Sequence, residues 1–486
     1  MKNKLAEIFF MILGAFIFFI ATSFYKGELS IGNYSLKKIN LLEDITIKNL
    51  SVNSSVAGEA VFGSIPSNDS AHTIAGNENH LNNDSLYRKD STYAAAKDAL
   101  RCANDPLAKF FESFNLTKSK RKKTRIGHWG DSIIGGDLIT EELRKILQEK
   151  FGGYGVGFVP IAYNDYDRGS ITNSSSSNWS KYTLKDSLSE KHPLGISGFV
   201  YEPSYVASVD PANLKNAGGS WVQYDAVERP GLDGFYDVKL FYGPGKSNDY
   251  IYYNGKSKQL NGTETVNQLV LNEKSPLQNI NVSFVCQSPI KIYGFSFESP
   301  NGVFVDNFGI GSTWGTELAK IPEKVLKGFD QYFDYSLVML EYGPNVVEHT
   351  PISEYPLYEK KMIAVINRFK TCFPNASVLV ISTADYWKEQ RGQNLPHPAV
   401  HGIVELQRKI AEKTNSAFWN LYEEMGGDNS MDSWVKAGLA RLDYNHFNSE
   451  GAKKVSGMLY KFLNEKYSEY NQKKVKAEVS AKKTKV

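Results

Sequence analysis

Residues 124–147 follow a pattern that few folds satisfy: a short strand, a tight turn and an amphipathic helix. The strand is expected over 124–129 and runs directly into Gly130, Asp131 and Ser132. Apolar residues then recur with the spacing of one buried helical face, at Ile139, Leu143, Ile146 and Leu147. A strand that turns directly into a helix is typical of the start of an α/β fold.

Two later segments have the composition of strands that are buried on both faces of a parallel sheet. They are residues 335–340 and 377–382, which are largely apolar. Helical patterns lie between and after them, at 355–369, at 401–414 and after Asn448. The alternation of strand and helix predicts a three-layer α/β/α sandwich around a parallel sheet.

Residues 161–302 have a different character. Short segments such as 234–242 and 280–285 alternate apolar and polar residues, and turn residues separate them. This region lacks the periodicity of a helix over any useful window. The pattern predicts a β-sandwich inserted into the α/β domain.

The N-terminus carries a membrane-targeting segment. Lys2 and Lys4 precede an apolar run that begins at Ile8 and extends to Phe24. The run is longer than a signal-peptide core and shorter than a full transmembrane helix, and its one cleavage site, 21–23, is weak. We therefore expect an uncleaved signal anchor in the inner membrane, with a cleaved signal peptide as the alternative. The preceding charge predicts a periplasmic or cell-envelope protein, or a secreted one if the segment is cleaved.

The chain is too long for one hydrophobic core, and we expect six segments along it. They are a signal anchor or signal peptide (1–24), a flexible Ser/Asn-rich tether (25–90), the first part of the α/β domain (91–160), the inserted β-sandwich (161–302), the second part of the α/β domain (303–466) and a basic disordered tail (467–486).

Composition argues against two kinds of partner. The formal net charge is only +3 and the basic residues are not concentrated in the body of the chain, so no nucleic acid is expected. Cys102, Cys286 and Cys372 have neither the spacing of a zinc site nor that of a disulfide framework, so no metal is expected. The sequence allows either one disulfide with one free thiol or three buried thiols.

Two sets of polar side chains lie where catalytic residues are expected. Ser132 follows a strand and precedes a helix, which places its hydroxyl at the carboxyl edge of the sheet, near the positive end of that helix. Taken alone, Gly-Asp-Ser is more often an ordinary turn. Asp443 lies three residues before His446, just ahead of the last helix. A carboxylate in that position can accept from the imidazole Nδ1 and leave Nε2 facing outward as a base.

Four sequence blocks, in this order, resemble those of the SGNH (GDSL-type) hydrolases: residues 130–132, 306–312, 343–345 and 443–446. The resemblance implies the three-layer SGNH sandwich and a catalytic triad. In that triad Ser132 is the nucleophile, His446 the general base and Asp443 the carboxylate that orients the base. Asp131 is assigned a supporting role.

The resemblance also implies an oxyanion hole, the set of N–H donors that stabilises the negative oxygen formed during acyl transfer. Its donors are the backbone N–H of Ser132, the side-chain amide of Asn345 and the N–H of one glycine. Gly311 fits that glycine best by its spacing from Asp306, and Gly309 is the alternative.

Further motifs resemble the peptidoglycan O-acetylesterases of Gram-negative envelopes, at 128–132, 147–152, 157–160, 418–419 and 425–434. Those enzymes carry a carbohydrate-binding-module-like β-domain between the serine and glycine blocks, which is where the predicted insert lies. The resemblance implies that an acetyl ester is removed from a glycan, most of all from the N-acetylmuramic acid of peptidoglycan. The reaction passes through an acetyl-enzyme and needs no cofactor.

Three other functions fit the same residues. A polysaccharide O-acetyltransferase can use the same triad, an esterase can act on another acetylated polysaccharide, and a non-catalytic envelope protein can bind glycan on this scaffold. The sequence does not decide the glycan, the oligomeric state or whether the β-insert binds sugar. Of the neighbouring residues, we expect His128 to pack behind the serine and Arg168 to lie on a solvated loop.

Overall fold

The computed structural model describes residues 104–484 apart from 121–122, 163–166, 188–190, 209, 211–212, 217, 273–274 and 391, and the short strands β1 (Ser30–Ile31) and β2 (Tyr34–Ser35). Residues 1–80 and 81–486 form two separate units. In the first unit β1 and β2 pair antiparallel. The predicted signal anchor and nearly all of the predicted tether lie outside the described residues. Among the helices that are described, none has the length and apolarity to cross a membrane.

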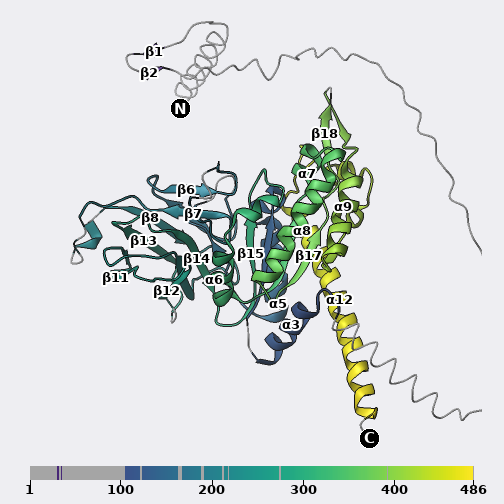
Figure 1. The fold of residues 1–486 in the computed structure, drawn as a ribbon, viewed down its shortest axis with the longest axis horizontal. Coiled ribbons are helices and arrows are strands. Elements are labelled where there is room, and N and C mark those ends of the chain that lie inside the picture. Colours follow the sequence, from purple (N-terminus) through teal and green to yellow (C-terminus); the bar gives the residue numbers. More distant parts are fainter. Residues whose placement is uncertain are drawn as a thin grey trace, which may run out of the picture. The chain divides into compact units, whose positions relative to one another are not determined.

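A five-stranded parallel sheet forms the centre of the second unit (Figure 1). Its order is β15 (Gly302–Gly309), β3 (Lys123–Gly130), β16 (Tyr335–Glu341), β17 (Ser377–Ile381) and β20 (Ala417–Trp419). The three strands expected from the sequence are confirmed to within one residue at each end. The chain passes from β3 to β15 on one side and then returns to β16 on the other. Open α/β sheets bind their ligands at such a reversal of strand order, beyond the carboxyl ends of the strands.

Helices cover both faces of this sheet, so the predicted three-layer α/β/α sandwich is confirmed. One face packs against α6 (Glu323–Phe333), α8 (Tyr355–Cys372) and α9 (Val400–Lys413). The other packs against α3 (Ala108–Lys120), α5 (Leu138–Phe151) and α12 (Ser449–Thr484). Shorter helices are α4 (Ser132–Gly135), η2 (Leu214–Asn216), η3 (Thr316–Lys320), α7 (Pro344–His349), η4 (Ile352–Glu354), α10 (Leu421–Met425) and α11 (Ser430–Lys436).

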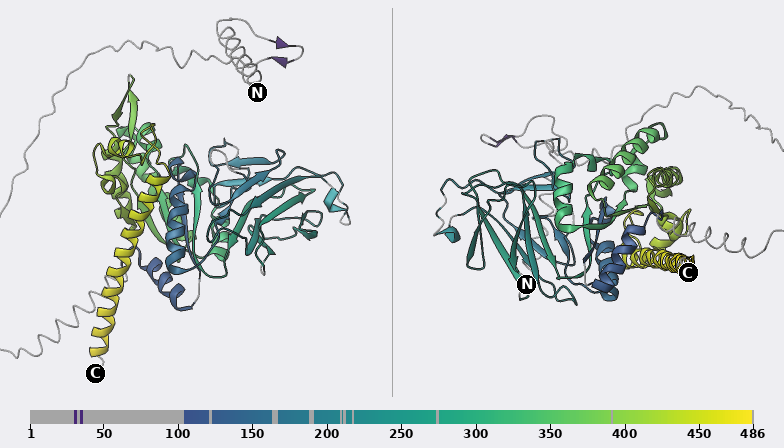
Figure 2. Two further views of the ribbon diagram at one scale, coloured as in Figure 1. Left: turned by 180° about the vertical axis from the view of Figure 1, so that it is seen from behind. Right: turned by 60° about the horizontal axis from the view of Figure 1, so that its bottom comes forward.

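The C-terminal helix corrects the prediction of a disordered tail over 467–486. Helix α12 continues through almost all of this range and extends past the rest of its unit (Figure 2). Tyr470 explains part of its length, because the ring packs 5.5 Å from that of Phe111 on α3. The Tyr470 hydroxyl and the Lys474 ammonium both donate to Glu112. These partners lie more than 350 residues away in the sequence, so composition alone does not reveal them.

Residues 157–298 contribute two antiparallel sheets. The first has the order β11 (Lys256–Gln259), β10 (Tyr250–Tyr253), β13 (Asn279–Val285), β8 (Ser220–Asp225) and β5 (Thr172–Ser175). The second has the order β12 (Asn267–Asn272), β9 (Asp237–Tyr242), β14 (Ile292–Glu298), β7 (Phe199–Glu202) and β6 (Ser180–Thr183), with β4 (Gly157–Val159) also paired to β14. Tyr224 of the first sheet contacts Phe295 and Phe297 of the second, so the sheets pack face to face.

A buried ionic network joins these sheets to the parallel sheet. Arg125 of β3 is 1% exposed and donates to Asp306 of β15 at 2.7 Å and to Glu298 of β14. Burial alone raises the pKa of Glu298, but the charges of Arg125 and Lys123 outweigh burial and hold that pKa below its usual value. Loss of one partner leaves a buried charge without compensation, which costs about 3–5 kcal/mol.

Candidate active site

The predicted nucleophile lies at the carboxyl end of β3, where the strand order reverses. Strand β3 ends at Gly130 and α4 begins at Ser132. A Cβ at Gly130 would lie 2.5 Å from the carbonyl oxygen of Glu341, so the two strands can approach this closely only with glycine here. The Asp131 side chain caps α4 by accepting from the N–H of Ile133 at 2.9 Å. Strand, cap and helix together fix the Ser132 backbone at the edge of the sheet.

Asp131 also ties the serine turn to the neighbouring turn after β16. Its second oxygen accepts from the N–H of Gly343 at 3.0 Å, two residues before Asn345. The carboxyl is fully buried, and burial raises its pKa to about 6 against the opposing effect of the two backbone bonds; nearby Glu341 adds to the increase. The supporting role predicted for Asp131 thus has a geometric counterpart.

His446 lies within hydrogen-bonding distance of both Ser132 and Asp443. His446 Nε2 is 2.9 Å from Ser132 Oγ, and His446 Nδ1 is 2.9 Å from Asp443 Oδ2. The other Asp443 oxygen accepts from the backbone N–H groups of Asn445 and His446, at 3.0 Å each. Partial burial raises the pKa of Asp443, but these hydrogen bonds, led by that of the His446 ring, lower it to about 2.

The charge of Asp443 determines how the imidazole is used. An ionised carboxylate can only accept, so Nδ1 donates to it and the neutral ring presents a lone pair at Nε2. That lone pair faces the Ser132 hydroxyl, which donates to it. The arrangement can move a proton from the serine to the histidine while the carboxylate stabilises the imidazolium that forms.

The remaining predicted donors lie on two loops beside the serine. Asn345 is the second residue of α7, and its side-chain amide donates to the carbonyl of Thr313 at 3.3 Å. The N–H of Ile310 donates to the carbonyl of Gly130 at 3.0 Å, which places Gly311 next to the serine turn. Among the described residues, the N–H of Gly311 has no hydrogen-bond partner.

The alternative glycine is already engaged. The N–H of Gly309 donates to the side-chain oxygen of Asn307 at 3.0 Å. A Cβ on Gly309 would lie 2.8 Å from the backbone of Gly135 in α4, so this glycine allows β15 to pack closely against the serine helix. The geometry therefore favours Gly311 as the donor and gives Gly309 a packing role.

Comparison with solved structures identifies the fold. A peptidoglycan O-acetylesterase structure matches 74% of this chain and 96% of its own length, with 22% sequence identity and a TM-score of 0.61. This chain has the fold of that esterase. Two further matches are too weak to carry an argument. An acetyl xylan esterase matches 33% of this chain and 80% of its own length, with 20% identity and a TM-score of 0.26. A carbohydrate esterase from Cellvibrio japonicus matches 60% of this chain and 99% of its own length, with 8% identity and a TM-score of 0.24. No protein-family model and no curated sequence matches the chain.

Two other residues considered from the sequence, His128 and Arg168, have well-defined partners. His128 is fully buried behind the serine, as expected, and its Nε2 lies 2.9 Å from Glu341 Oε2. Arg168 is buried and donates to the carbonyl oxygens of Phe158 and Asn307, so its expected place on a solvated loop is wrong. Sequence reasoning did not identify Glu341, although a carboxylate that ends an otherwise apolar strand was a usable signal.

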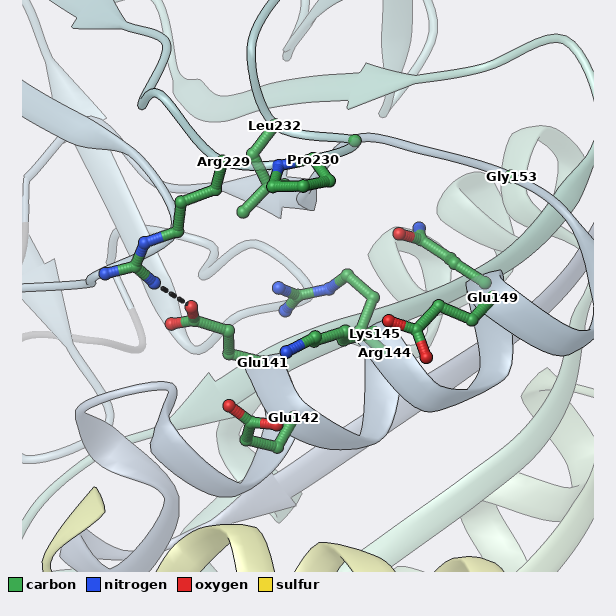
Figure 3. A pocket seen from close by; sticks show the side chains of 11 residues that line it. Glu141, Glu142, Arg144, Lys145, Glu149, Gly153, Arg229, Pro230 and Leu232 are labelled. Carbon is green, nitrogen blue, oxygen red and sulfur yellow. Dashed lines mark hydrogen bonds and ion pairs between the residues drawn. The ribbon is translucent and has the colours of Figure 1, made fainter. Parts of the chain in front are cut away.

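A cavity of about 570 Å³ lies between α5 and residues 229–232 (Figure 3). One wall carries charged side chains of α5, including Glu141, Lys145 and Glu149. Arg229 reaches across from the other wall to an ion pair with Glu141. No triad residue lines this cavity, so it is separate from the candidate active site.

The described residues contain no group of three His, Cys, Asp or Glu side chains that could hold a metal ion. Cys286 and Cys372 are both buried thiols that form no disulfide. Cys102 lies outside the described part of the chain.

Proposed function

We propose that this protein is a serine esterase that removes O-acetyl groups from an envelope glycan, with the N-acetylmuramic acid of peptidoglycan as the main substrate. One observation carries the proposal: Ser132 Oγ lies 2.9 Å from the Nε2 of His446, whose ring is held by Asp443. The shared fold with a peptidoglycan O-acetylesterase, which spans 96% of that protein, supports the choice of substrate.

The reaction follows from the positions of these groups. Ser132 Oγ attacks the acetyl carbonyl carbon while His446 Nε2 takes the hydroxyl proton. The carbonyl oxygen becomes negative and is stabilised by the N–H groups of Ser132 and Gly311 and by the Asn345 amide. The bond to the sugar oxygen then breaks, and His446 returns the proton to that oxygen. The sugar leaves as a free alcohol and Ser132 carries the acetyl group.

The second half repeats these steps with water. His446 Nε2 removes a proton from water, the resulting hydroxide attacks the acetyl carbon, and the same donors stabilise the oxyanion. The bond to Ser132 Oγ breaks, the proton returns to the serine and acetate leaves. A sugar hydroxyl in place of water would make the same site a transferase.

The test is acetate release from O-acetylated peptidoglycan, with acetylated xylan as the comparison substrate. We expect peptidoglycan to be the faster substrate and Ser132→Ala to abolish release from both. Faster release from xylan would overturn the choice of substrate. No release from either glycan, or transfer of a labelled acetyl group to an added chitooligosaccharide in preference to water, would reject the esterase proposal.

We also propose that the protein acts in the periplasm or cell envelope, held at the inner membrane by the apolar segment that ends near Phe24. Fractionation of cells that produce the full chain tests this. We expect the protein in the inner-membrane fraction and accessible to protease after the outer membrane is opened. Recovery from the cytoplasm would contradict the proposal.

A further inference from the structure

A small hairpin projects from the edge of the sheet that carries the candidate active site. It consists of β18 (Trp387–Gln390) and β19 (Gln393–Pro396), which pair only with each other, and it extends beyond α7 and α9 (Figure 1). A two-stranded hairpin is at best marginally stable by itself, so contacts at its base must hold it. Those contacts lead to both sides of the candidate site.

The first contact is with the loop of the triad. The ring of Trp387 stacks on that of Tyr444, with centroids 5.4 Å apart and planes inclined by 26°. The backbone N–H of Trp387 donates to the Tyr444 carbonyl at 3.3 Å. Tyr444 lies between Asp443 and His446 and has a φ of 54°, so the chain bends sharply where the hairpin touches it.

The second contact is with the helix that carries Asn345. Glu348 of α7 accepts from the Lys388 ammonium and, at 3.3 Å, from the Tyr386 hydroxyl. Glu348 lies three residues after Asn345 and therefore on the same side of α7. The hairpin is thus bonded to the loop that supplies the base and to the helix that supplies an oxyanion donor.

Strand register divides the hairpin into two faces. Trp387 pairs with Pro396 and Glu389 with Asn394, so these four side chains share the face that stacks on Tyr444. The other four strand side chains, with Lys388 bonded to α7, share the opposite face: Lys388, Gln390, Gln393 and Leu395.

The Trp387 face has the chemistry of a sugar-binding surface. The Trp387 ring is already stacked on Tyr444 and its indole N–H donates to Asp385, so the accessible part of this face is Pro396, Glu389 and the half-buried Asn394. A proline ring can cover the apolar side of a pyranose, while the Asn394 amide and the Glu389 carboxylate can bond its hydroxyls. Residues 387–396 contain two cationic side chains and one anionic side chain, so no strong charge favours a polyanion. Through Trp387 this face adjoins Tyr444, in the loop that carries Asp443 and His446.

We propose that the β18–β19 hairpin binds the glycan chain beside the acetylated sugar, so that the enzyme acts on polymeric glycan in preference to small acetyl esters. The proposal rests on the esterase function above and adds a second region of substrate contact to the same site. A chain held at the hairpin orients its acetyl group toward Ser132, which raises kcat/KM only for substrates long enough to reach it.

A shortened hairpin tests this. Replacement of residues 389–394 by Asn-Gly joins Lys388 to Leu395, which already face each other across the strands, through a two-residue turn that suits their twist. Both base contacts remain. We expect at least a tenfold loss of acetate release from O-acetylated peptidoglycan, and a change of less than twofold in kcat/KM for 4-nitrophenyl acetate.

A matched pair of point variants separates sugar contact from a general effect on the hairpin. Asn394→Ala removes an amide from the Trp387 face and should lower release from the polymer about threefold or more. Gln393→Ala removes an amide from the opposite face and should change it by less than twofold. Equal effects of the two variants would overturn the assignment of the face.

The remaining outcomes of the shortened hairpin are equally decisive. Equal losses on polymer and aryl ester would mean that the hairpin only positions the triad loop, and unchanged rates on both would mean that it does not contact glycan. Either result overturns the proposal. Failure of the esterase function is a separate result, because the unaltered protein would then release no acetate from peptidoglycan.

Discussion

Asn345→Ala removes one of the proposed oxyanion donors and leaves Ser132, His446 and Asp443 in place. The Asn345 amide carries two N–H groups, and one is directed to the Thr313 carbonyl at 3.3 Å. That bond is long and half-exposed, so its loss alters the folded structure little. The bond fixes the plane of the amide, however, and so leaves the second N–H available to a developing oxyanion. The variant therefore lowers transition-state stabilisation without removing the nucleophile or the base.

The expected magnitude follows from the number of donors. The proposed oxyanion hole has three donors, from Ser132, Gly311 and Asn345, and loss of one such donor costs about 2.7–4 kcal/mol, a factor of about 10² to 10³ in kcat. KM should change little, because a neutral carbonyl needs the donor much less than an oxyanion does. Steady-state hydrolysis of 4-nitrophenyl acetate measures both constants.

A matched control is Asn173→Ala in β5, which removes another partly buried amide that donates to a backbone carbonyl, that of Ile161 at 3.1 Å. It should leave kcat within about twofold. An Asn345→Ala variant that keeps kcat within threefold of the unaltered enzyme would refute the assignment of this side chain. A large rise in KM with kcat unchanged would show that Asn345 binds the ground state instead.

Three further variants test charges at the candidate site and in the buried ionic network. Asp443→Asn can turn an N–H toward His446 Nδ1 and stabilise the wrong tautomer, so kcat for 4-nitrophenyl acetate should fall about 10²- to 10⁴-fold with an unchanged circular dichroism spectrum; full activity would contradict the role of this carboxylate. Asp131 has a pKa of about 6 when folded, above its unfolded value of about 3.9, so its ionisation costs up to about 3 kcal/mol of stability as the pH rises from 4 to 6. Urea unfolding across that range should show a smaller loss for Asp131→Asn than for the unaltered protein, and equal losses would exclude this coupling. Arg125→Met leaves Asp306 buried without its bonded cation, while Glu298 keeps Lys123 and Lys239, so the free energy of unfolding should fall by about 3–5 kcal/mol, whereas a change below 1 kcal/mol would show that the network contributes little.

The parallel sheet could be predicted because the composition of single short segments indicates its strands. Residues 335–340 and 377–382 are apolar on both faces, and only a strand covered on both sides tolerates that composition. The positions of Ser132 and of the Asp443–His446 pair, relative to the first strand and the last helix, were also local signals. The 2.9 Å contact between Ser132 Oγ and His446 Nε2 joins residues far apart in the sequence, and the order of the sequence blocks could only suggest it.

Other features depend on partners far away in the sequence. The length of α12 depends on Tyr470 packing against α3, and the charge-rich composition of the tail favoured disorder instead. The choice between Gly309 and Gly311 depends on which N–H the Asn307 side chain takes. The β18–β19 hairpin is polar and short, with no periodicity that extends over a useful window, so its existence follows from its contacts with Tyr444 and Glu348.

Covalent labelling shows whether Ser132 is an activated nucleophile. The protein is treated with a fluorophosphonate, which reacts with an activated serine hydroxyl, and the modified peptide is identified by mass spectrometry. We expect one label, on Ser132, that is lost in Ser132→Ala and strongly slowed in His446→Ala, with acetyl-ester hydrolysis lost in parallel. A label on a different residue, or ester hydrolysis that persists in Ser132→Ala, would contradict this expectation.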